Sequence, residues 1–172
     1  MTLSSLDLQK LNSLSETAFQ EALTRCCGSH RWVEAMQSHR PFADMDALLK
    51  AAEKTWWGLS REDWLEAFQH HPKIGDINNL RAKFANTKDW AQNEQSGVDS
   101  ASEDVIQALA EGNTVYETKF GHIFIVCATG KTASEMLEIL QSRLPNPPEE
   151  ELRVAAGEQN KITRLRLEKL AL

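Results

Sequence analysis

The stretch SETAFQEALTRCCG, residues 15–28, shows the pattern that most of the chain repeats. Ser15 is suited to cap a helix, because its hydroxyl can accept a hydrogen bond from a backbone N–H of the first turn. Gly28 is suited to end the helix. Between them, apolar residues recur at the spacing of one helix face: Phe19, Ala22, Leu23 and Cys26. The stretch therefore predicts a short helix that buries one side.

Outward from this stretch, Ser, Thr, Asp or Pro precedes other periodic segments, and Gly or Pro often follows them. This pattern predicts an all-α fold, a single domain over residues 1–172 that forms a bundle of about eight helices. The expected helices cover residues 6–14, 15–27, 29–36, 44–57 (opened by Asp44 or Asp46), 60–71, 74–86 joined to or abutting 87–95, 100–119 (opened by Ser100 or Ser102), 132–140 and 148–170.

Residues 120–128, FGHIFIVCA, do not follow the helical pattern. Their β-branched and apolar residues favour a buried strand, but no second run of this kind is present to pair with it. A buried helix or a helix-connecting loop fits equally well, because short apolar runs discriminate poorly. If the segment is extended, its backbone N–H and C=O groups need other partners, and a ligand could supply them.

Composition limits the class of protein. Apolar residues make up 41% of the chain, enough for a core in which Trp32, Trp56, Trp57, Trp64 and Trp90 are expected. The net charge of −6 argues against nucleic-acid binding. No apolar run approaches the roughly 20 residues that span a bilayer, no secretory signal is visible, and the final Leu-Ala-Leu is no peroxisomal address. With three cysteines expected as reduced thiols, we expect a cytoplasmic protein.

The most unusual local sequence is HHPKIGD, residues 70–76. His71 ends a predicted helix at a corner that Pro72 stiffens, and an imidazole held there could act as a general acid or base near neutral pH. Alternatively, the two histidines only interact favourably with the negative end of the helix dipole. Metal binding is disfavoured, because adjacent histidines diverge on a helix and no Cys or carboxylate stands at ligand spacing.

Two further polar features are candidates for binding a small molecule. Asn93, Glu94 and Gln95 cluster at a predicted helix end, where they could bind a polar ligand or simply be solvated. Arg166 falls on the same helix face as Ile162 and Leu170, so it is expected along the apolar stripe. An arginine there would need an anionic partner, from the protein or from a substrate, unless it extends to solvent.

At these residues the chain resembles the OHCU decarboxylases, which act on 2-oxo-4-hydroxy-4-carboxy-5-ureidoimidazoline in urate breakdown. The resemblance runs over nearly the whole chain, in the order CCGSHRWVEAM, HPKIGD, the EQ segment, KFGHIFIVCATGK and EQNKITRLRLEKL. HPKIGD is a specific signal, and the others are strong as an ordered set. The resemblance implies an all-α fold, a small-molecule substrate, no metal or organic cofactor, and a homodimer. From charge and composition, we expect no nucleic-acid or membrane partner.

The resemblance also implies roles for individual residues. His71 matches the catalytic histidine, with Glu94 and Arg166 as further catalytic groups. The remaining matches are substrate contacts: Pro72, Ala91, Gln92, Asn93, Gln95 and the main chain of Ile125, Val126, Cys127, Ala128 and Thr129. Two positions depart from the family pattern. Ala91 stands where a serine is common, so it can offer only its backbone, and Thr129 stands where many relatives carry arginine.

The reaction implied needs no cofactor, because the substrate's own ring imine can accept the electron pair left by CO2, and no phosphate-binding loop is present. The expected product is (S)-allantoin, with His71 as the proton donor. The alternative is a non-catalytic helical module that binds a metabolite or peptide, for which stoichiometric binding without CO2 release would be diagnostic.

Overall fold

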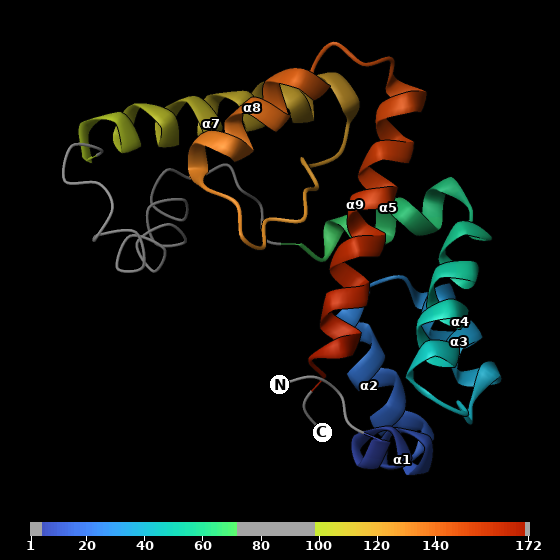
Figure 1. Cartoon of the computed structure of the whole chain (residues 1–172). Coiled ribbons are helices and arrows are strands. Elements are labelled where there is room, and N and C mark those ends of the chain that lie inside the picture. The colour runs from blue at the N-terminus through green and yellow to red at the C-terminus, as the bar shows by residue number, and fades with distance from the viewer. Residues whose placement is uncertain (1–4, 72–98, 171–172) are drawn as a thin grey trace. The chain divides into compact units, whose positions relative to one another are not determined.

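The computed structural model describes residues 5–71 and 99–170. Within these ranges every regular element is an α-helix, which confirms the predicted all-α class (Figure 1). The predicted helices over 74–86 and 87–95 lie outside the described residues. The helices are α1 (Ser5–Ser13), α2 (Glu16–Cys26), α3 (His30–His39), α4 (Met45–Trp57), α5 (Arg61–Gln69), α7 (Asp99–Phe120), α8 (Ala133–Arg143) and α9 (Pro148–Glu168).

Side-chain caps fix the helix starts where the sequence predicts them. Ser15, Ser29 and Asp44 each accept a hydrogen bond from a backbone N–H in the first turn. Ser60 forms a reciprocal capping box with Asp63 at the start of α5. These caps satisfy N–H groups that have no partner within the helix, and each contributes about 1 kcal/mol.

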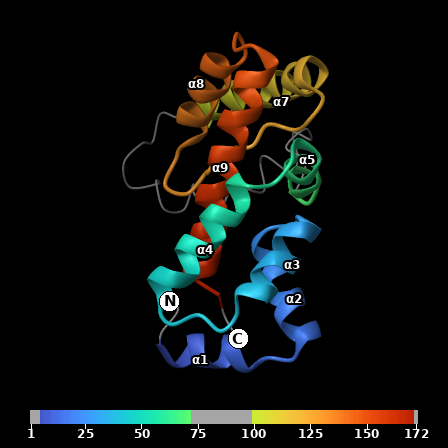
Figure 2. The ribbon, with the colours of Figure 1, turned by 90° about the vertical axis from the view of Figure 1, so that its right-hand side faces the viewer.

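The internal contacts divide the chain into two compact units, residues 1–71 with 156–172 and residues 72–155. The single domain over 1–172 therefore stays a prediction. In the first unit, α3 packs between α2 and α4 (Figure 2). Two buried tryptophan side chains connect helices of the first unit by hydrogen bonds. Trp32 Nε1 donates to the Ala52 carbonyl of α4 at 3.1 Å, and Trp56 Nε1 donates to the Ala156 carbonyl of α9 at 2.8 Å.

The tryptophan prediction holds for some residues and fails for one. Trp32 and Trp56 are 0% and 1% exposed, and Trp64 is half-buried with its Nε1 donating to the Trp56 carbonyl. Trp57 is wrong as a core residue, because it is 43% exposed and meets Trp64 edge-on at the end of α4. Trp90 lies outside the described residues.

The second unit is built around α7 and α8, which pack against each other (Figure 1). Gly121 ends α7 with φ +79°, and its N–H donates to the Glu117 carbonyl at 2.8 Å. Glycine suits this left-handed position because it has no Cβ. The buried core of the unit comprises Ile106, Leu109, Ala110, Tyr116, Phe120, Phe124, Val126, Met136 and Leu140.

The segment left open by the sequence, residues 120–128, is neither a strand nor a helix beyond Phe120. Residues 123–128 run without regular hydrogen bonding, and Phe124, Ile125, Val126 and Cys127 are buried. The alternative of a helix-connecting segment is therefore the one observed. In the described ranges, no helix combines the length and apolar character needed to cross a bilayer.

Candidate active site

His71 lies at the end of α5, where the helix breaks. The N–H of His70 donates to the Ala67 carbonyl and that of His71 to the Phe68 carbonyl, each at 3.2 Å. These short-range bonds tighten the last turn. The imidazole of His71 is half-buried, and its Nε2 is hydrogen-bonded to Oε1 of Gln159 on α9. The corner predicted from the sequence thus directs the ring toward a helix far away in the chain.

A buried polar chain continues from this imidazole. Gln159 is 0% exposed, and its Nε2 donates to Thr163 Oγ1 at 3.0 Å, one turn further along α9. Thr163 hydrogen-bonds in turn to the sulfur of Cys27, which also receives the Ser29 N–H. An unpaired buried amide or hydroxyl costs about 1–3 kcal/mol. The folded protein is therefore expected to keep the hydrogen bonds of the Gln159 amide and the Thr163 hydroxyl.

Burial favours the neutral form of the adjacent thiols of Cys26 and Cys27, at the end of α2. Burial raises the pKa of Cys27 to about 11, against the opposing effect of its Ser29 and Thr163 hydrogen bonds. Burial likewise raises the pKa of Cys26 to about 12, although Arg166 lowers it in part. None of Cys26, Cys27 and Cys127 forms a disulfide. The predicted reduced state agrees with this, and neither Cys26 nor Cys27 is suited to be a nucleophile.

Arg166 does not lie on the buried stripe of α9; of the two alternatives that the sequence leaves open, the one in which its side chain extends to solvent is observed. Its side chain is exposed, and Ile162 and Leu170 on the same face are only partly buried. The buried stripe runs instead through Gln159, Thr163 and Leu167. This row faces the core, although Gln159 and Thr163 are polar. Nη1 of Arg166 reaches the Arg25 carbonyl at 3.5 Å, at the limit of a hydrogen bond.

The extended segment of the second unit is held by side chains. Arg143, at the end of α8, donates from Nη1 to the Ile125 carbonyl at 2.7 Å, and its guanidinium lies 4.6 Å from the centre of the Phe124 ring. Lys131 Nζ donates to the Cys127 carbonyl at 2.8 Å. Side chains therefore satisfy backbone groups that a sheet partner would otherwise satisfy.

Arg143 is itself fixed by a buried ion pair. Its Nε and Nη2 contact both carboxylate oxygens of Glu151 at 2.5–3.1 Å, and the two residues are 6% and 0% exposed. The hydroxyl of Tyr116 donates to Glu151, and Asn146 Nδ2 donates to it at 3.1 Å. Burial and the Glu151 carboxylate raise the pKa of Tyr116 well above its usual value. The Glu151 carboxylate thus accepts hydrogen bonds from Arg143, Tyr116 and Asn146.

The predicted site residues divide between the two units. His71 and Arg166 belong to the first unit. Ile125, Val126 and Cys127 are buried in the second, with Ala128 half-buried and Thr129 exposed. The other predicted residues lie outside the described ranges: Pro72, Ala91, Gln92, Asn93, Glu94 and Gln95.

Comparison with known proteins identifies the family of this chain. A profile of the OHCU decarboxylase family matches residues 12–168. The chain belongs to the OHCU decarboxylase family. A crystal structure of OHCU decarboxylase in the presence of (S)-allantoin is 38% identical with a TM-score of 0.69, over 88% of this chain and 96% of that one. A structure of (S)-allantoin synthase, at 21% identity and TM-score 0.68, shares the fold over 93% of this chain and 52% of that one.

Curated relatives agree with the family assignment. The uric acid degradation bifunctional protein TTL of Arabidopsis thaliana is 41% identical over 84% of this chain, which spans 45% of that protein's length. A putative 2-oxo-4-hydroxy-4-carboxy-5-ureidoimidazoline decarboxylase of Homo sapiens is 30% identical over 94% of both chains.

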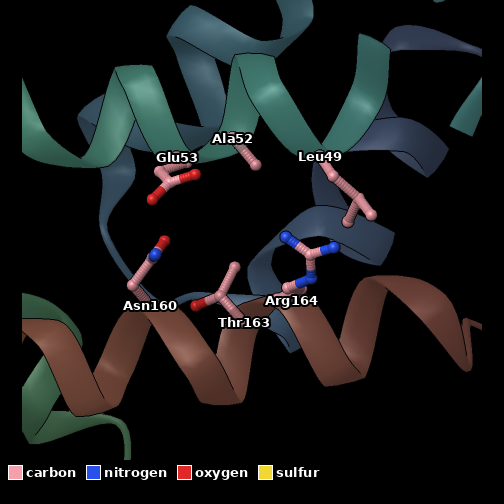
Figure 3. A pocket seen from close by; sticks show the side chains of 6 residues that line it. All are labelled: Leu49, Ala52, Glu53, Asn160, Thr163 and Arg164. Atoms are coloured by element: carbon pink, nitrogen blue, oxygen red, sulfur yellow. The ribbon is translucent and has the colours of Figure 1, made fainter. Parts of the chain in front are cut away.

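A small pocket lies between α4 and α9 in this OHCU decarboxylase family member (Figure 3). The space between its lining residues, about 220 Å³, is partly open to solvent. No three His, Cys, Asp or Glu side chains in the described ranges gather where they could hold a metal ion. The pocket is lined by Leu49, Ala52, Glu53, Asn160, Thr163 and Arg164.

Sequence reasoning missed Gln159, Arg143 and Glu151. Gln159 had a usable signal, because it precedes Thr163 and Leu167 at four-residue spacing, and a buried polar residue in such a row needs a partner. No sequence signal pointed to Arg143 or Glu151, because charged residues are common near helix ends.

Proposed function

We propose that this protein decarboxylates 2-oxo-4-hydroxy-4-carboxy-5-ureidoimidazoline to (S)-allantoin and CO2 in urate degradation. Family membership over residues 12–168 supports the reaction class. The observation that carries the proposal to this chain is the half-buried imidazole of His71, held at a helix end by the buried amide of Gln159. Such a fixed titratable ring is what proton transfer requires.

The chemistry assigns the protein a limited task. The bond between the ring carbon and the carboxylate breaks, its electron pair is delocalised into the adjacent ring imine, and CO2 leaves. The intermediate then takes a proton on carbon, and delivery to one face gives one enantiomer. His71 in its protonated form is the proposed donor, so the reaction proceeds without a cofactor.

Other residues are proposed to hold the substrate. Glu94 orients the substrate hydroxyl or His71, and Gln95 and Arg166 bind ring and ureido oxygens. The guanidinium of Arg166 is exposed, with a 3.5 Å contact to the Arg25 carbonyl, which suits such a role. We place it away from the departing carboxylate, because a bidentate bond there would stabilise the ground state and slow the reaction.

The remaining contacts are proposed for Pro72, for Ala91, Gln92 and Asn93, and for the backbone of the extended segment. Arg143, itself fixed by Glu151, anchors the segment at the Ile125 carbonyl, so the proposed substrate contacts fall on backbone groups other than this carbonyl. Ala91 offers only its backbone, and Thr129 offers a hydroxyl where an arginine is common.

The direct test is His71→Ala with freshly generated substrate. We expect kcat to fall on the order of 10²-fold or more, with the circular dichroism of the folded protein unchanged. Because the substrate also decays spontaneously to racemic allantoin, the enantiomeric composition of the product must be measured. Unchanged formation of (S)-allantoin by this variant would refute the role, and binding without CO2 release by the wild type would favour the non-catalytic alternative.

We further propose a cytoplasmic homodimer in which residues 1–172 act as one domain. Light scattering in solution tests the dimer, and a single cooperative unfolding transition common to several probes tests the single domain. Fractionation of cells tests the location.

A further inference from the structure

The starting observation is the contact between His71 and Gln159, together with what lies behind it. Gln159 is completely buried, so the orientation of its amide is set by its partners. One end of the amide meets His71 Nε2, and the other meets Thr163 Oγ1 at 3.0 Å. The orientation of the amide decides what each partner must do, because the amide oxygen only accepts a hydrogen bond and the amide nitrogen only donates one.

The atoms that meet in these two hydrogen bonds give the orientation: Oε1 of Gln159 faces His71 Nε2, and Nε2 of Gln159 donates to Thr163 Oγ1. The far end of the chain is compatible with this orientation, because hydrogen bonds from the Ser29 backbone and the Thr163 side chain lower the pKa of Cys27, as expected where both groups donate to its sulfur. With its hydrogen directed to Cys27, Thr163 Oγ1 can accept only from the amide nitrogen of Gln159. The amide oxygen then faces His71, and it requires an N–H donor on the imidazole. Every hydrogen bond in the chain thus runs in one direction, from His71 toward Cys27.

We propose that Gln159 is a positioning residue for His71: its amide oxygen accepts the Nε2–H hydrogen and fixes the imidazole in the Nε2–H tautomer. The neutral ring then has no hydrogen on Nδ1, and Nδ1 is the nitrogen that exchanges a proton with the substrate. This inference rests on the proposed role of His71. Thr163 acts one step further out, because it holds the amide in the required orientation.

The consequence concerns turnover rather than affinity. Gln159 is buried behind the imidazole, so its loss should leave substrate binding largely intact while the ring rotates or populates the other tautomer. A fall in kcat with little change in KM is therefore the expected signature. A defect in folding alone would instead lower the amount of active enzyme and leave the tautomer of the folded fraction unchanged.

The first experiment observes the tautomer without measuring activity. Long-range proton–nitrogen correlation spectra of the ¹⁵N-labelled protein distinguish Nε2–H from Nδ1–H histidines, and the His71 signals are those lost in His71→Asn. We expect the neutral Nε2–H form in the wild type and a mixture of tautomers in Gln159→Leu. An Nδ1–H form in the wild type would overturn the proposal.

The second experiment measures kinetics. We expect Gln159→Leu to lower kcat about 10-fold, the loss of one hydrogen bond, with KM within about 2-fold of the wild type. Gln159→Glu retains an acceptor oxygen and should recover most of this loss. Gln107→Leu is the matched control, since it makes the same change at an exposed position of α7, and it should behave as wild type.

Thr163→Val serves if Gln159→Leu does not fold. It conserves shape, removes the anchor of the amide, and should lower kcat about 3-fold with KM unchanged. Wild-type kcat in both variants, or equal losses in Gln159→Leu and Gln159→Glu, would overturn the proposal. Wild-type activity of His71→Ala would instead refute the proposed function, whatever tautomer the spectra show, so the two failures are distinguishable.

Discussion

Replacing Glu151 by glutamine tests whether the buried ion pair holds the second unit together. The carboxylate receives Arg143 at 2.5–3.1 Å, Asn146 at 3.1 Å, and the Tyr116 hydroxyl. An amide keeps the volume but places an NH2 group against donors and leaves the guanidinium, 6% exposed, without its counter-charge. Breaking a buried pair costs about 3–5 kcal/mol, and the remaining amide oxygen places Glu151→Gln near the lower end.

For a chain of this length, each kcal/mol corresponds to a Tm shift of about 2–4 °C. We therefore expect Tm to fall by about 6–12 °C in differential scanning calorimetry. Hydrogen exchange should accelerate in the segment 124–128, because Arg143 no longer fixes the Ile125 carbonyl. The matched control is Glu150→Gln, at the exposed neighbouring position, which should shift Tm by less than about 2 °C. A similar small shift for Glu151→Gln would refute the reasoning.

Three further predictions follow from the first unit. Gly28→Ala should cost about 1–3 kcal/mol and reduce activity, because its Cβ would lie 2.3–2.6 Å from the Cβ and ring of His70; chemical denaturation and kinetics measure both effects. With pKa values of about 12 and 11, only about 10⁻⁴ to 10⁻³ of the thiols of residues 26–27 are thiolate at pH 8. Iodoacetamide should spare them in the native protein and label them in urea, and rapid native labelling would contradict their burial. Arg166→Ala should raise KM more than it lowers kcat, whereas Arg164→Ala, whose partner is Glu168, should change neither.

The sequence predicts the helices well because their signals are local. Ser15, Ser29, Asp44 and Ser60 are caps whose partners lie three residues away, so neither burial nor topology is needed to place them. The candidate His71 corner is predicted for the same reason, since it is a helix end before a proline.

What the sequence could not supply depends on distant parts of the chain. The apolar residues Ile162 and Leu170 predict a buried face that includes Arg166, whereas the helix buries the row of Gln159, Thr163 and Leu167. Because Gln159 and Thr163 are polar, the apolar pattern of the sequence does not point to the buried row. It points instead to the neighbouring row on the helix, one residue away. The burial of Gln159 and Thr163 becomes understandable only when His71, 88 positions away from Gln159, is seen to be a partner.

The ion pair between Arg143 and Glu151 also limits how this protein can evolve. Apolar residues replacing such a buried group together can be neutral or even stabilising, whereas removal of one charge alone is costly. A lineage that accumulates substitutions one at a time would therefore pass through a poorly folded intermediate. We expect descendants to keep both charges, with Tyr116 beside them, even where selection for catalysis has been relaxed.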